Sequence, residues 1–196
     1  MFFGEPFGGL LPGARGAVLA VLLRTDAPLT GRQIHAMVSD DYSLWSVQKA
    51  LQALAQIGVV QMHTVGRAGI HTINEHHAAV AHLRDLVDPL AALTSIIKDA
   101  VDSCVQAVVL FGSIARGETR PDSDIDLAVI AAPDWAGRVA LEDVVKTRLG
   151  NDCDVVVFTE SDFETLAIEG EPVVHEILRD GIALAGTKPP ARPGAT

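Results

Sequence analysis

Cysteine is nearly absent from this sequence, and so are long hydrophobic runs. The two cysteines, Cys104 and Cys153, lie far apart and form no CxxC pair, so neither a disulfide framework nor a zinc site is expected, and we predict buried free thiols in a reducing cytoplasm. No apolar run is long enough to cross a bilayer, and no membrane partner is expected. The N-terminal stretch MFFGEPFGGLLPG lacks a basic region and a continuous apolar segment, so no signal peptide is predicted.

Positive charge is also scarce, most of all in the second half of the chain. Residues 1–88 carry six Lys/Arg and seven Asp/Glu, a net charge of −1, whereas residues 89–196 carry nine and eighteen, a net charge of −9. The acidic second half should repel polyanions unless cations intervene. The overall composition, 48% hydrophobic and 20% charged, is typical of a globular chain with one large or two small domains.

The first part of the chain has the pattern of three helices followed by a hairpin. Residues 14–24 are mostly apolar, Thr30 can cap a short helix, and Ser43 can cap a longer one whose apolar residues recur every three or four positions. Alternating stretches on both sides of GRAG then predict a short hairpin. This order predicts a winged helix-turn-helix domain over residues 10–75.

Such a domain would offer DNA a small set of side chains on its helices and wing. The candidates are Arg32, Ser46, Gln48, Lys49, Gln52 and Arg67. Few of them are cationic, although binding to DNA phosphates requires cations, and winged helices also bind proteins. DNA and protein therefore both stay open as partners of this domain.

A helical segment interrupted near Pro89 follows, and we expect residues 76–103 to form a linker helix between two domains. Four histidines lie near its start, at His71, His76, His77 and His82. Their spacing fits no standard zinc pattern, so we expect solvated histidines.

Strands and helices alternate from residue 104 onward. This pattern predicts a small mixed sheet flanked by helices over residues 104–186, followed by a disordered proline-rich tail over residues 187–196. The chain as a whole is predicted to be a two-domain α+β protein.

Two aspartates occur one residue apart within the strand-like stretch DSDIDLAVI. Side chains alternate along a strand, so Asp124 and Asp126 share a face while their apolar neighbours point into the core. Like charges this close raise a carboxyl pKa unless a cation compensates, and Mg²⁺ is a natural compensation. In the later strand NDCDVVVF, Asp152 and Asp154 also share a face, and one of them would complete an acidic triad if the two strands are neighbours.

A phosphate-binding element precedes these acids. Gly112 and Ser113 follow a predicted strand and open a short helix, whose free N–H groups can receive an anion. Arg116 and Arg120 are cations nearby, and for Arg116 two roles stay open: binding a phosphate, or pairing with Glu118 or an aspartate. An anion cradle beside a carboxylate pair suits a metal–nucleoside triphosphate.

These residues resemble a known family. Gly112-Ser113, ten further residues and Asp124-Ile125-Asp126 match the GSx10DxD pattern of the DNA polymerase β-like nucleotidyltransferases. The fuller string GSIARGETRPDSDIDLAVI is similar to the minimal nucleotidyltransferase (MNT) branch, and a preceding winged helix is similar to its fused winged-helix members. The family's third carboxylate precedes a hydrophobic run, which falls on Asp154, with Asp152 as a competitor.

The resemblance implies a nucleotidyltransferase that moves a nucleoside monophosphate from an NTP, commonly ATP, to a hydroxyl of a protein or small molecule. It implies two Mg²⁺ ions, replaceable by Mn²⁺. The implied metal-binding and catalytic residues are Asp124, Asp126 and Asp154, and the implied nucleotide-binding residues are Gly112, Ser113 and Arg116.

The resemblance also implies a biological setting, because MNT proteins are commonly antitoxins that modify a partner toxin. A HEPN-like toxin is then the expected protein partner. The alternative is a DNA-binding transcriptional regulator, acting as a homodimer, whose nucleotidyltransferase domain senses nucleotide or is inactive. The two hypotheses can coexist in a self-regulating toxin–antitoxin operon.

Overall fold

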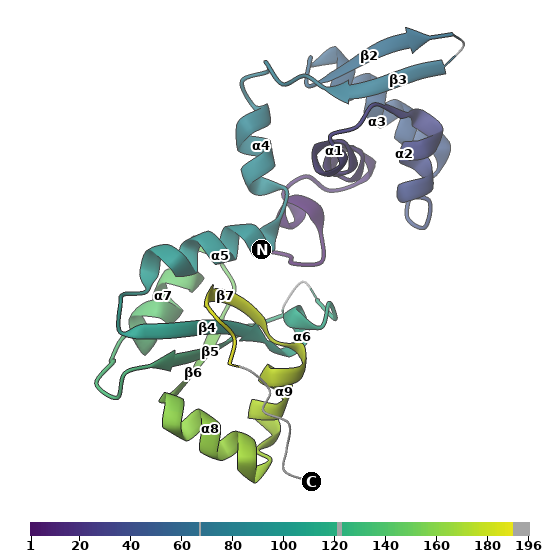
Figure 1. The fold of residues 1–196 in the computed structure, drawn as a ribbon. Helices are drawn as coiled ribbons and strands as arrows, with labels where there is room; N and C mark the ends of the chain where they lie inside the picture. Colours follow the sequence, from purple (N-terminus) through teal and green to yellow (C-terminus); the bar gives the residue numbers. More distant parts are fainter. Residues whose placement is uncertain (67, 121–122, 190–196) are drawn as a thin grey trace. The chain divides into compact units, whose positions relative to one another are not determined.

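The computed structural model describes residues 1–66, 68–120 and 123–189, and it divides into two compact units (Figure 1). One unit is Glu5–Pro89, and the other combines Met1–Gly4 with the chain from Leu90 onward. Among the described residues, no helix has both the length and the apolar character needed to span a membrane.

The N-terminal unit contains helices followed by a small antiparallel sheet. In chain order its elements are η1 (Pro6–Gly9), α1 (Ala14–Thr25), β1 (Leu29–Thr30), α2 (Gly31–Met37), α3 (Leu44–Gln56), β2 (Val60–Val65), β3 (Ala68–Ile73) and α4 (Val80–Leu86). The strand order is β1-β3-β2, with β3 antiparallel to both neighbours. The three helices and the hairpin predicted from the sequence are therefore present.

Local capping and a shared core explain these elements. The Thr30 hydroxyl accepts from the Gln33 backbone N–H, while the Gln33 side chain accepts from the Thr30 N–H at 2.9 Å, which is a capping box at the start of α2. The Ser43 hydroxyl caps α3 by accepting from the Ser46 N–H at 3.2 Å. The apolar faces of α1, α2 and α3 meet at fully buried side chains, among them Val18, Leu22, Ile34, Val47 and Leu54.

The C-terminal unit is a mixed four-stranded sheet with helices on both faces (Figure 1). Its elements are α5 (Pro89–Ala100), β4 (Val105–Phe111), α6 (Gly112–Ala115), β5 (Ile125–Ala131), α7 (Arg138–Leu149), β6 (Cys153–Phe158), α8 (Glu160–Glu169), α9 (Pro172–Asp180) and β7 (Ile182–Gly186). The strand order is β6-β5-β4-β7, in which β5 and β6 are parallel and the other pairs are antiparallel. The α+β fold class predicted from the sequence is confirmed for this unit.

Alternation along the central strands produces two cores. Leu110 and Leu127 point to the face covered by α5 and α7, whereas Val109 and Ala128 point to the face covered by α8 and α9. The apolar runs of β4 and β5 are continuous because both faces of these strands are buried.

The segment predicted as a separate linker helix, residues 76–103, is instead divided between the units. Val80 and Val87 pack in the N-terminal core, whereas Leu93 and Ile97 pack in the C-terminal core. Pro89 lies at the division, as the first residue of α5. Proline is tolerated in the first turn of a helix, where its missing N–H costs no hydrogen bond, but it would interrupt one continuous helix.

The predicted ends of the domains also differ from the structure. The N-terminal unit begins earlier than residue 10, since Phe7 is buried in its core. Of the predicted tail, residues 190–196 lie outside the described residues, while Lys188 donates to the Gly181 carbonyl at 3.1 Å.

Two expectations about individual side chains need correction. Both cysteines are free, but Cys104 is exposed, because it lies in the turn before β4 and not within an apolar run. Cys153 is largely buried in β6, and burial raises the pKa of its thiol to about 12. His71, predicted to be solvated, is half-buried in β3; burial lowers its pKa, and a hydrogen bond with the Leu29 backbone opposes this effect.

Candidate active site

The acids singled out in the sequence meet where β5 and β6 run side by side. The parallel pairing sets Asp126 directly opposite Asp154. Both alternate with residues that pack in the core under α5 and α7, so both side chains leave the sheet on the opposite face, which α8 and α9 cover. Asp126 is half-buried and Asp154, on the edge strand, is exposed. The expectation that the two strands are neighbours is confirmed.

The bend after β4 lies directly against Asp126. Phe111, the last residue of β4, pairs with Asp126, and Gly112 then turns the chain into α6 with a φ of 72°. A Cβ atom at position 112 would clash with the Asp126 carboxylate. Glycine is therefore needed at position 112 for two reasons: the backbone has a left-handed conformation, and the Asp126 carboxylate fills the space that a Cβ would take.

The charges around Asp126 are unbalanced. Its pKa is raised above the ordinary value, first by burial and then by the negative charges of Asp154, Asp124 and Glu176, and Arg116 opposes the shift only in part. Asp124 and Asp154 are therefore both close enough to act on Asp126. Glu176, on α9, was not recognised in the sequence.

Asp152 lies in a different environment from Asp154. Its carboxylate is exposed and pairs with the Lys146 ammonium at 2.5 Å. It is not among the charges that shift the pKa of Asp126. The geometry favours Asp154 over Asp152 as the third acid of this site.

Arg116, expected either at the phosphates or in a structural pair with Glu118 or an aspartate, is held between two glutamates, one of which is Glu118. Its Nε donates to Glu118 Oε2 at 3.0 Å, and its Nη1 donates to Glu176 Oε1. Glu118 also closes the bend, since its N–H donates to the Ser113 carbonyl at 2.9 Å. Ser113, the other candidate phosphate ligand, is half-buried at the start of α6.

A buried amide supports the loop that leads to the acids. Asn151, 7% exposed, is the one buried polar residue among those described. Its Nδ2 donates to the Ser123 carbonyl at 3.2 Å and to the Met1 carbonyl at 3.0 Å. These bonds anchor the residue before Asp124 to the start of β6, and the sequence alone gave no sign of this role.

The donor set at this site fits a hard divalent cation. Carboxylate oxygens are the ligands that Mg²⁺ prefers, and the negative charge around Asp126 is only partly compensated by Arg116. Within the described part of the chain, no three His, Cys, Asp or Glu side chains are grouped so as to hold a metal ion on their own.

The raised pKa of Asp126 predicts a pH-dependent stability. The folded state holds this proton more tightly than the unfolded state, so stability falls as pH rises from the ordinary value of 3.8 through the raised pKa. Asp126→Asn removes the charge and is expected to raise the Tm at pH 7 in the absence of metal. The gain should vanish near pH 3, where the carboxyl is protonated in both states. Thermal unfolding of both proteins across this range is the measurement, and an equal Tm at pH 7 would contradict the electrostatic account.

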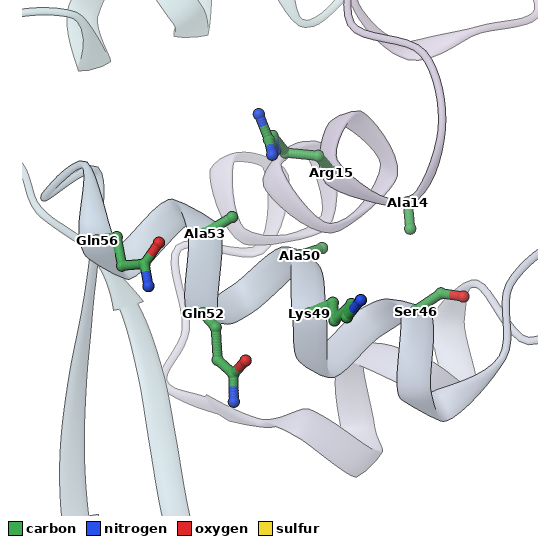
Figure 2. Close-up of a pocket in the computed structure, with 8 residues that line it drawn as sticks. All are labelled: Ala14, Arg15, Ser46, Lys49, Ala50, Gln52, Ala53 and Gln56. Carbon is green, nitrogen blue, oxygen red and sulfur yellow. The ribbon is translucent and has the colours of Figure 1, made fainter.

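The DNA-binding candidates of the N-terminal unit lie around α3. Figure 2 shows the side chains that line a pocket between α1 and α3: Ala14, Arg15, Ser46, Lys49, Ala50, Gln52, Ala53 and Gln56. The volume of this pocket is about 390 Å³. A second pocket, of about 930 Å³, includes Arg32, Gln48 and Gln52. Lys49 Nζ lies 4.0 Å from the centre of the Trp45 ring. Arg67 lies outside the described residues.

Comparison with known proteins finds a family match in the C-terminal unit. Residues 93–189 match the family described as "Polymerase beta, Nucleotidyltransferase". The match lies within the C-terminal unit and includes the motif residues from Gly112 to Asp126. None of the curated proteins compared with the chain matches it.

Several solved structures show a weaker similarity. A toxin–antitoxin crystal structure with AMP-PNP is 25% identical, with a TM-score of 0.38 over 51% of this chain and 75% of that chain. A tri-AMPylated HEPN toxin of Shewanella oneidensis in complex with its MNT antitoxin is 25% identical, with a TM-score of 0.35 over 50% of this chain and 73% of that chain. A HOP2 structure concerned with DNA recognition and protein interaction is 26% identical, with a TM-score of 0.30 over 32% of this chain and 100% of that chain. TM-scores this low do not by themselves establish a shared fold.

Proposed function

We propose that this chain, whose residues 93–189 match the polymerase beta nucleotidyltransferases, transfers a nucleoside monophosphate from ATP to a hydroxyl of an acceptor and releases pyrophosphate. The observation that carries the proposal is the contact between the Gly112 bend and Asp126, with Asp154 aligned beside it. This arrangement puts the Gly112 bend and the acids at one end of the sheet, where we expect them to hold a phosphate and a metal ion together.

Each residue would have a distinct task in the reaction. Asp124, Asp126 and Asp154 would bind Mg²⁺, and Gly112, Ser113 and Arg116 would bind the phosphates that leave. When bound, Mg²⁺ supplies charge stabilisation to the attacking and leaving oxygens. The acceptor oxygen forms a bond to the α-phosphorus, while the bond between the α-phosphorus and the oxygen that bridges it to the β-phosphorus breaks. Asp154 would take the hydroxyl proton, and pyrophosphate would leave with the electron pair.

The acceptor we propose is a protein, in the setting of a toxin–antitoxin pair. The support is the resemblance of residues 112–130 to the MNT branch, in which the acceptor is often a hydroxyl of a partner toxin. The strongly acidic second half of the chain disfavours a long RNA acceptor. A HEPN-like toxin is the partner to test first.

The position of the radioactive label distinguishes nucleotidyl transfer from phosphoryl transfer. The protein is incubated with Mg²⁺, a co-purified HEPN-like partner and ATP labelled at either the α- or the γ-phosphorus. Transfer of a nucleoside monophosphate moves the α-label to the acceptor and leaves the γ-label in pyrophosphate. Transfer of the γ-label to the acceptor would overturn the proposal, and so would α-labelling that persists unchanged in Asp124→Ala/Asp126→Ala.

The same assay separates the two candidates for the third acid. Asp154→Ala is expected to lower transfer by at least about a hundredfold, because it removes a charge aligned with Asp126. Asp152→Ala should stay within about twofold of wild type, because it loses only an exposed pair with Lys146. The opposite ranking of the two variants would show that the third acid has been misassigned.

A second function, DNA binding through a winged helix-turn-helix, is favoured by the charge of the N-terminal unit. Residues 42–74, which contain α3 and the hairpin, include no Asp or Glu. Arg15 and Arg32 line the two pockets beside α3, and Lys49 lies on α3 itself. An acid-free polar face with several cations is the kind of surface that binds phosphates.

A gel-shift titration with the DNA upstream of the gene tests this second function. Binding should weaken as salt rises, and Lys49→Ala should weaken it further and reduce the slope of log K against log salt by about 1. Lys98→Ala, which removes an exposed cation from the other unit, is the matched control. Negligible binding at low salt, or equal effects of the two variants, would argue against DNA binding.

A further inference from the structure

The pairing of Arg116 suggests a role for a residue outside the GSx10DxD motif. Arg116 follows α6 directly, and α6 packs against α9, which carries Glu176. The side chain of Glu176 is 29% exposed, compared with 66% for Glu118, the other partner of Arg116. Glu176 is therefore the more enclosed of the two carboxylates that hold the guanidinium.

The helix that carries Glu176 is fixed to the sheet. Val174 and Ile177 are fully buried against the residues of β4 and β5 that face α8 and α9. A side chain on a packed helix holds its partner more firmly than one on an exposed turn, because its backbone position is set by the core. Glu118, by contrast, lies in the irregular chain after α6.

The Arg116–Glu176 pair lies beside the proposed metal-binding acids. The charges of both side chains act on Asp126, in opposite directions. Nε and Nη1 of Arg116 are occupied by the two glutamates, while Nη2 has no hydrogen bond to any residue in the described part of the chain. This leaves the N–H groups of Nη2 for an oxygen of an incoming triphosphate.

We propose that Glu176 is a positioning residue, which holds Arg116 at the place where it binds a phosphate of the nucleotide. The inference rests on the proposed function, because it takes the bound ligand to be a metal–nucleoside triphosphate. Glu176 itself touches neither the nucleotide nor the reacting atoms. The contact of Glu176 in this region is with Arg116, so removing Glu176 should weaken nucleotide binding chiefly while Arg116 is present.

Calorimetric titration with ATP and Mg²⁺, without acceptor, tests the proposal on the full chain. Glu176→Gln is expected to raise the Kd for ATP by about tenfold, and Arg116→Ala by at least as much. In the double variant the Kd should equal that of Arg116→Ala, because the two residues act as one unit. Glu176→Asp keeps the charge and should bind ATP more tightly than Glu176→Gln. Glu171→Gln, an exposed glutamate just before α9, should match wild type.

The alternatives give different results. A Kd within twofold of wild type for Glu176→Gln, or a tighter one, would show that Glu176 does not position Arg116 or that it withholds Arg116 from phosphate. Effects that multiply in the double variant would show that Glu176 acts independently of Arg116. Absence of ATP binding by the wild type would instead overturn the proposed function, and the inference with it.

In a transfer assay, Glu176→Gln should raise KM for ATP while kcat stays within about twofold.

Discussion

Replacing Asp126 with alanine is expected to lower nucleotidyl transfer by at least about a thousandfold, a loss of roughly 4 kcal/mol of transition-state stabilisation. The reason is its place at the centre of the site, beside Asp154 on the neighbouring strand and against the Gly112 bend. The measurement is the single-turnover rate of transfer of α-labelled ATP to the acceptor.

Two controls make this loss specific. Asp143→Ala removes an exposed acid on α7 and should leave the rate within about twofold of wild type. The Tm of Asp126→Ala should not fall below that of wild type at pH 7, because burial and the neighbouring negative charges make the ionised carboxylate less favourable in the folded state than in the unfolded chain. A rate within tenfold of wild type would mean that Asp126 is not part of the catalytic machinery.

Replacing Gly112 with alanine is expected to destabilise the protein by roughly 2–4 kcal/mol and to abolish transfer. Gly112 has a φ of 72°, which disfavours any residue with a Cβ, and a Cβ there would clash with the Asp126 carboxylate. Either the bend or the carboxylate must then move. Urea unfolding and the transfer assay measure the two effects.

Gly117 and Asp126 supply the controls for this substitution. Gly117 has a φ of 73° but no atom within 4 Å of an added Cβ, so Gly117→Ala should lose only the backbone contribution, about 1–2 kcal/mol. Removing the carboxylate in Gly112→Ala/Asp126→Ala should recover the steric part of the loss. If Gly112→Ala and Gly117→Ala are equally destabilised, the contact between the bend and Asp126 is not as tight as described.

Much of the C-terminal unit could be predicted because its strands are buried on both faces. VQAVVLF became β4, and DIDLAVI became β5 with a shift of one residue at each end. The opposition of Asp126 and Asp154 followed from one assumption, that β5 and β6 are neighbours. Because side chains alternate along a strand, this assumption also placed the Asp126 and Asp154 side chains on the same face of the sheet. The local sequence pattern and one assumed strand pairing were therefore sufficient to predict this part of the site.

The partners of the site were harder to predict, because they depend on how distant segments pack. Glu176 reaches Arg116 only because α9 folds back over the sheet, and the periodicity of α9 does not say which motif it will meet. Asn151 likewise looks like an ordinary turn residue until its bonds to Ser123 and Met1 are seen. The prediction of a separate linker helix was wrong for a similar reason, because the first part of residues 76–103 packs in the N-terminal core and the later part packs in the C-terminal core.

The most direct test of the central claim is a titration of Mn²⁺ by electron paramagnetic resonance, with and without a non-hydrolysable ATP analogue. If three acids and the glycine–serine bend hold a cation and a triphosphate together, wild type should bind Mn²⁺ much more tightly when the analogue is present, and Asp124→Ala/Asp126→Ala should show no such gain. The account would be contradicted if the affinity for Mn²⁺ were the same with and without the analogue, or if the analogue tightened Mn²⁺ binding equally in the double variant.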